Sequence, residues 1–169
     1  AVATWTVPSN PSDIISFSID KPNKINRLTD VNKDIFYNVE FGKVEEITYK
    51  SVDEKYVQGW IVKPPNFDSN KKYPLVLRIH GGPHSMYHVG FNYNFQLHAA
   101  QDQVVLYTNP RGSTGYGYDF ANAIQNAYPG NDYDDIMYGV DEVISKGYID
   151  ENRMYVYGGS GGGVLTSWI

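Results

Sequence analysis

The stretch Arg153-Met154-Tyr155-Val156-Tyr157-Gly158-Gly159-Ser160-Gly161-Gly162-Gly163 joins a short strand-like run to a cluster of glycines. Residues 158–162 fit G-x-S-x-G, the pattern of a nucleophile elbow, in which a serine occupies the sharp turn between a strand and a helix. Glycine two positions before and after the serine lets the strand and the helix approach closely. We therefore predict that Ser160 is a nucleophile presented above the carboxyl edge of a sheet, with a helix opening at 164–169.

Two other interpretations of the glycine cluster stay open from the pattern alone. One is a flexible loop, and the other is a cradle for a phosphate group. A phosphate cradle is the weaker of the two, because the chain has no G-x-x-x-x-G-K-[ST], and the G-x-G-x-x-G alternative needs an acidic residue some twenty positions on, a position these 169 residues do not include.

A second motif, His80-Gly81-Gly82-Pro83, directly follows the apolar run 73–79. Acyl transfer builds negative charge on a carbonyl oxygen, and two backbone N–H groups aimed at that oxygen stabilise it. In the nucleophile-elbow architecture one donor follows the serine and the other comes from an H-G-G-type loop. We expect Gly161 and Gly82 to be these donors, with Gly81 as the alternative to Gly82. A plain strand-ending turn is the competing interpretation of this motif.

Away from these motifs, strands and helices alternate along the chain. Apolar and β-branched runs predict strands at 44–50, 58–62, 73–79, 103–108 and 153–157. Helices are predicted at 91–101, from the glycine-rich loop 109–115 to about 127, and at 133–146. For the last helix, Asn131 or Asp132 is the expected N-terminal cap. This order predicts an α/β fold with right-handed crossovers.

The first 43 residues have a different pattern. A strand is predicted at 14–19, a turn at 20–23, and a strand or turn at 34–41. The segment is too short to build its own core. Its first residues show neither the basic nor the apolar region of a signal peptide.

Composition narrows the class of function. The net charge is −5 with no basic run, so we expect no nucleic-acid partner. No apolar run approaches the roughly 20 residues that a membrane helix needs, so we expect a soluble protein with no membrane partner. Cysteine is absent, which excludes disulfides and thiolate metal sites and leaves a cytoplasmic and a periplasmic location equally open. We expect no cofactor and no metal.

The combined motifs resemble a known family. His80-Gly81-Gly82-Pro83-His84, then Asn109-Pro110-Arg111-Gly112-Ser113-Thr114-Gly115-Tyr116-Gly117, then Gly158-Gly159-Ser160-Gly161-Gly162 are similar to the prolyl oligopeptidase family of serine peptidases, in its acylaminoacyl-peptidase-like branch. The resemblance covers residues 44–169 and implies the N-terminal part of an α/β-hydrolase catalytic domain. By the same resemblance, residues 1–43 look like the last strands of a β-propeller and a linker.

The resemblance implies a serine-type peptidase that hydrolyses short peptides or acylated peptide N-termini through an acyl-enzyme on Ser160. Its implied partners are a peptide substrate, the propeller and the rest of the catalytic domain. Whether the protein forms an oligomer is left undecided. Two positions depart from the family pattern. Gly161 stands where tyrosine is often found, although its N–H is retained, and Glu54 stands where glycine is usual.

The general base and its acid partner are not identifiable. In α/β-hydrolases the order along the chain is serine, acid, histidine, but residues 161–169 hold neither aspartate nor histidine, and all four histidines precede Ser160. We expect His80 to shape the oxyanion loop rather than to act as the base. A serine without its base is a weak nucleophile. We therefore predict that this chain ends before the triad is complete and is inactive alone.

Other charged residues of the sequence are expected to have structural roles. Arg111 is expected to form a structural ion pair, with substrate binding as the alternative. The aspartates at 132, 134 and 135 fit a helix start rather than a metal site. Three other functions stay open: a carboxylesterase with the same elbow, a dipeptidyl aminopeptidase, and a non-catalytic fragment that serves binding or assembly.

Overall fold

Alternating side chains of one interior strand, β6 (Tyr73–Ile79), contribute to both core clusters. The computed structural model describes all residues 1–169, and in it β6 is buried along nearly its whole length. Leu75, Leu77 and Ile79 belong to one core cluster, whereas Val76 belongs to a second cluster. Because successive side chains of a strand point to opposite faces, a continuous apolar run needs cover on both faces. Strand β6 was predicted at these bounds.

Five strands form the main sheet in the order β4-β5-β7-β6-β8. The hairpin of β4 (Val44–Lys50) and β5 (Tyr56–Val62) is antiparallel, with Lys50 opposite Tyr56, and a short 3-10 turn, η1 (Val52–Glu54), lies between the strands. Strand β5 also pairs antiparallel with β7 (Val104–Asn109). Strand β6 pairs parallel with β7 on one side and with β8 (Ile149–Gly158) on the other. The sheet is therefore mixed, as expected for an α/β fold.

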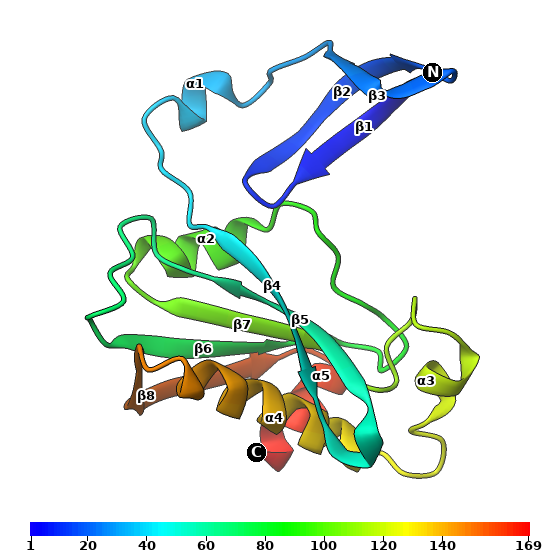
Figure 1. Cartoon of the computed structure of the whole chain (residues 1–169), viewed down its shortest axis with the longest axis vertical. Coiled ribbons are helices and arrows are strands. Elements are labelled where there is room, and N and C mark those ends of the chain that lie inside the picture. Colours follow the sequence, from blue (N-terminus) through cyan, green and yellow to red (C-terminus); the bar gives the residue numbers. More distant parts are fainter.

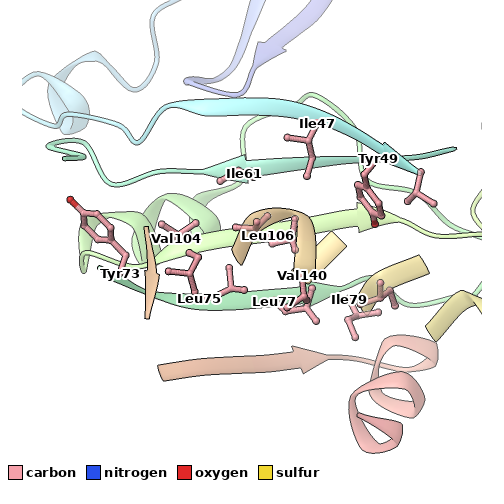
Figure 2. Close-up of a cluster of buried hydrophobic side chains, with 14 of the residues drawn as sticks. Ile47, Tyr49, Ile61, Tyr73, Leu75, Leu77, Ile79, Val104, Leu106 and Val140 are labelled. Atoms are coloured by element: carbon pink, nitrogen blue, oxygen red, sulfur yellow. The ribbon is translucent and has the colours of Figure 1, made fainter. Parts of the chain in front are cut away.

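Helices cover the two faces of this sheet (Figure 1). Helix α4 (Asn131–Ser145) places Ile136, Val140 and Val143 in the larger core cluster, with alternate side chains of the sheet (Figure 2). Helix α2 (Tyr93–Ala100) places Phe95 and Ala99 in the second cluster on the opposite face. The connection from β6 to β7 contains α2 and crosses one face of the sheet, whereas the connection from β7 to β8 contains α4 and crosses the other face, so the direction of winding reverses here. The carboxyl ends of β6 and β8 meet at this reversal, which is where α/β sheets form their sites.

The N-terminal residues form a separate sheet above the main one (Figure 1). Strands β1 (Val2–Val7), β2 (Asn10–Ser18) and β3 (Lys21–Arg27) pair antiparallel in that order. Neither core cluster contains a residue before position 44, in agreement with the expectation that this segment builds no core of its own. Whether these strands end a propeller, and whether the domain boundary lies at 43, stay predictions.

Several elements differ from the sequence-based expectation. Lys21–Arg27 is a strand rather than only a turn, and Lys33–Phe36 is a short helix, α1. Helix α3 (Tyr118–Asn122) ends well before residue 127. Asn126 has a left-handed φ of 58°, and the residue before Pro129 is biased away from helical geometry, so the chain cannot continue the helix there.

The starts of the last two helices also differ. Helix α4 has Gly130 at its N-cap position without a side-chain cap, so neither Asn131 nor Asp132 caps it as expected. Helix α5 (Gly161–Trp168) begins three residues before the predicted 164. The low helix propensity of three glycines concealed this start, because it is set by the elbow rather than by propensity. None of the helices is both long and apolar enough to cross a membrane.

Candidate active site

Ser160 occupies the turn between β8 and α5. It is solvent-exposed and has φ 56° and ψ −124°, a conformation that non-glycine residues rarely adopt. Such a residue costs roughly 1–3 kcal/mol and persists only where its surroundings fix it. The carbonyl oxygen of Ser160 accepts hydrogen bonds from the N–H groups of Gly163 and Val164 at 2.8 and 3.1 Å, which tie the serine to the first turn of α5.

Glycines on either side of Ser160 permit this turn. A Cβ atom at Gly158 would lie 2.4 Å from the carbonyl oxygen of Gly162, so no larger side chain fits between the strand and the helix. A Cβ atom at Gly162 would lie 2.4 Å from the carbonyl oxygen of Ile79, at the end of β6. The two glycines therefore let β8, β6 and α5 approach closely, as the G-x-S-x-G pattern predicts.

The His80-Gly81-Gly82 loop lies beside the elbow. A Cβ atom at Gly81 would lie 3.3 Å from Cβ of Ser160, and one at Gly161 would lie 2.9 Å from the carbonyl oxygen of Gly82. Gly82 has φ 125°, which favours glycine. The structure thus brings together Ser160, Gly161 and both glycines of the loop, although they lie some eighty residues apart in the sequence.

The N–H groups of these glycines are free. Neither Gly82, Gly81 nor Gly161 donates a backbone hydrogen bond to another group of the chain. For Gly161 this follows from its place in the first turn of α5, where N–H groups have no intrahelical acceptor. Helix N-termini of this kind favour negative charge. Free N–H groups beside an exposed hydroxyl can bind an oxygen that carries developing negative charge.

His80 is held in a fixed orientation inside the loop. Its Nδ1 lies 2.8 Å from the carbonyl oxygen of Gly81 and its Nε2 lies 2.9 Å from Oγ of Ser113. Because a carbonyl can only accept, Nδ1 carries the proton and Nε2 accepts the Ser113 hydroxyl. Burial lowers the pKa of the His80 imidazole, which keeps the ring neutral. Both ring nitrogens are occupied, so His80 supports the loop and is unavailable as a base.

The other three histidines also lie away from the serine hydroxyl. Nδ1 of His84 contacts the carbonyl oxygen of Gly112, and Nδ1 of His88 accepts the N–H of Gly90. His98, on α2, contacts Gln103 just before β7 and Tyr157 on β8. No histidine or carboxylate hydrogen-bonds to Ser160 within residues 1–169.

Arg111, in the loop after β7, forms the buried ion pair that the sequence favoured over a substrate contact. Its Nε and Nη2 donate to the two carboxylate oxygens of Asp135 at 2.9 Å each. Nη1 donates to Asp53 at 3.0 Å, and the Arg111 N–H also donates to Asp135. Both side chains of the Arg111–Asp135 pair are almost completely buried. Asp135 therefore anchors α4 to this loop instead of only facing the helix dipole.

Two features of the loop before α4 and of its first turn were not predicted from the sequence. Tyr128 donates its hydroxyl to the carbonyl oxygen of Gly161 at 2.6 Å. Asp132 is 1% exposed; its Oδ1 accepts the Gly130 N–H, and its Oδ2 has no partner. Burial raises the pKa of the Asp132 carboxyl. The Tyr128 contact belongs to no short motif, because it depends on how the loop before α4 packs against the elbow.

Comparison with known proteins finds related sequences and structures. Residues 89–169 match the family model described as "Prolyl oligopeptidase family". The "Uncharacterized peptidase YuxL" of Bacillus subtilis is 42% identical over 169 residues, which cover 99% of this chain. The chain belongs to the prolyl oligopeptidase family.

Other members of the prolyl oligopeptidase family are similar over most of the chain. "Dipeptidyl-peptidase 5" of Aspergillus fumigatus is 38% identical over 128 residues, or 70% of this chain. The acylaminoacyl peptidase of Pyrococcus horikoshii superposes with a TM-score of 0.90 at 30% identity and covers 99% of this chain. The chain spans only 25% of YuxL, 18% of the Aspergillus protein and 27% of the Pyrococcus chain.

Proposed function

We propose that these residues form the nucleophile half of a serine peptidase site, with Ser160 as the nucleophile and the N–H groups of Gly82 and Gly161 as the oxyanion hole. The observation that carries the proposal is the exposed Ser160, at φ 56°, beside two glycine loops whose N–H groups are free. Gly81 is the alternative second donor, because its N–H is also free and its backbone is near Cβ of Ser160.

The proposed reaction is acyl transfer to the serine. Oγ of Ser160 attacks the carbonyl carbon of the scissile bond, and its proton passes to a general base. The carbonyl oxygen becomes an oxyanion that accepts the two N–H groups, which stabilises the transition state more than the ground state. Loss of the amine leaves an ester on Ser160, and water then hydrolyses it.

The base and its acid partner come, in this proposal, from residues other than these 169. His80 is committed to Gly81 and Ser113, and the remaining histidines make no contact with Ser160. We infer that the rest of the catalytic domain and the propeller complete the enzyme. The 169-residue polypeptide alone would then keep only the residual catalysis of an oxyanion hole.

The proposed substrates are short peptides or peptides with an acylated N-terminus. Support for an acylated terminus comes from the acylaminoacyl peptidase, which is 30% identical with a TM-score of 0.90. Support for a free dipeptide terminus comes from relatives named dipeptidyl-peptidase 5.

The test is hydrolysis by the full-length protein and its Ser160→Ala variant. The substrates are an N-acetylated amino-acid anilide, an unblocked dipeptide anilide and a nitrophenyl ester. We expect the wild type to cleave at least one anilide and the variant to lose at least about 10³-fold in kcat. Cleavage of the ester alone would favour a carboxylesterase. Equal anilide turnover by both proteins would overturn the assignment of Ser160.

A further inference from the structure

Tyr128 makes an unusual contact with the elbow. Among side chains outside α5, it is the one that hydrogen-bonds to residues 158–163, through its hydroxyl and the carbonyl oxygen of Gly161 at 2.6 Å. The bond links the loop before α4 to the first turn of α5, so it joins two segments 33 residues apart in the sequence. Burial raises the pKa of the Tyr128 phenol, which keeps it a hydrogen-bond donor at neutral pH.

The same hydroxyl occupies the space that a side chain at position 161 would need. A Cβ atom at Gly161 would lie 3.1 Å from the Tyr128 hydroxyl, and 2.9 and 3.0 Å from the carbonyl oxygen and carbon of Gly82. Gly161 is thus enclosed between the oxyanion loop and Tyr128. The space at position 161 is therefore restricted from two sides, which favours glycine there.

We propose that Tyr128 is a positioning residue of the oxyanion hole, which holds Gly161 through its carbonyl so that the Gly161 N–H faces the same point as the Gly82 N–H. The inference rests on the proposed serine peptidase function. The Ser160 backbone is strained, and the bond from Tyr128 adds a constraint at the next residue. Oxyanion donors act through a fixed position, so a small displacement of one N–H weakens binding of the transition state more than binding of the substrate.

The experiment compares Tyr128→Phe with Tyr138→Phe in the full-length protein. Tyr138 lies on α4, is 46% exposed and makes no hydrogen bond through its hydroxyl, so it is a matched control. For each variant we would measure kcat and KM on the cleaved anilide, the inhibition constant of the matching peptide aldehyde, and the melting temperature. The aldehyde reports the oxyanion hole because it forms a tetrahedral adduct with the serine.

For Tyr128→Phe we expect kcat to fall roughly 3- to 10-fold, the size of one lost neutral hydrogen bond. The aldehyde constant should rise by the same factor, while KM stays within about twofold and Tyr138→Phe matches the wild type. Unchanged kcat and aldehyde binding would overturn the positioning role. A loss of kcat and of aldehyde binding that is fully explained by a lower melting temperature would also overturn the positioning role. Absence of any Ser160-dependent hydrolysis in the wild type would instead overturn the proposed function.

A second variant tests the shared space. Gly161→Ala introduces the Cβ atom that would contact both Gly82 and Tyr128, so it should reduce kcat strongly in the wild-type background. In the Tyr128→Phe background one of these contacts is removed, and the same substitution should cost at least about threefold less. Strictly additive losses would show that Tyr128 and a side chain at 161 do not compete, and would contradict the proposal.

Discussion

The local geometry at Ser160 could be predicted because its causes are close in the sequence. Gly158 and Gly162 lie two residues away on either side, and their missing side chains let β8 and α5 meet. The contact of Tyr128 could not be predicted in the same way. It depends on how a loop 33 residues from Gly161 packs against the elbow, and a tyrosine in a tyrosine-rich chain gives no signal by itself. Asp132 was expected at a helix start, but its nearly complete burial depends on tertiary packing.

Asp132 provides a prediction about pH. Its Oδ2 is buried without a partner and its pKa is raised, so the folded protein binds this proton more tightly than the unfolded chain does. The Asp132 contribution to stability is therefore fully present below the unfolded pKa of about 3.9 and is lost as pH rises through the higher folded value.

Asp132→Asn should therefore stabilise the full-length protein by roughly 1 kcal/mol at pH 7, with little effect near pH 4. The asparagine keeps an oxygen that can accept the Gly130 N–H. The measurement is chemical unfolding at both pH values. Asp134→Asn, in the same turn of α4 but less buried, serves as the control. A destabilised Asp132→Asn protein at pH 7 would show that the charge itself is needed.

At the scale of elements, the prediction of strands and helices succeeded where one pattern dominates. The continuous apolar run of β6 and the apolar stripe of α4 each matched their observed elements. It failed where tertiary packing decides, as in α3, which ends at Asn122. Ile124, just beyond it, is buried and would contact a Cβ atom at Gly112. Packing against the Arg111 loop thus replaces further turns of helix.

The Arg111–Asp135 pair is expected to hold α4 against the loop after β7. Asp135→Leu leaves the buried guanidinium with only the exposed Asp53 as a charged partner, so unfolding free energy should fall by about 3 kcal/mol. Arg111→Met combined with Asp135→Leu should recover most of that loss, because no unpaired charge remains. Chemical unfolding of the full-length proteins checks this. Asp53→Asn should cost far less, because this partner is exposed to solvent. A double variant no more stable than Asp135→Leu would contradict this account.

At the scale of the whole molecule, one edge of the main sheet stands out. Strand β8 is the last strand of the order β4-β5-β7-β6-β8 and has no neighbour beyond it. Met154 and Tyr155 on β8, and Trp168 at the end of α5, are largely exposed. An open edge with apolar side chains favours association with another strand or another chain. We expect the remaining catalytic domain to cover this edge in the full-length protein.

The 169-residue polypeptide expressed alone should therefore self-associate and bind a hydrophobic dye. Tyr155→Lys should reduce both effects, because a lysine on an edge strand opposes pairing. The same polypeptide should react with a fluorophosphonate probe far more slowly than the full-length protein, since it lacks a base near Ser160. Light scattering, dye fluorescence and probe labelling measure these properties. A well-folded monomer that labels at the rate of an active hydrolase would contradict both expectations.

The central claim is that Ser160 and the N–H groups of Gly82 and Gly161 form one acyl-transfer site. The most direct test is a crystal structure of the full-length protein after reaction with a peptidyl phosphonate. Our account predicts a bond from Oγ of Ser160 to phosphorus, with one phosphonyl oxygen within roughly 2.7–3.1 Å of both N–H nitrogens. A phosphonate bound to another residue, or an oxygen that faces neither N–H group, would contradict it.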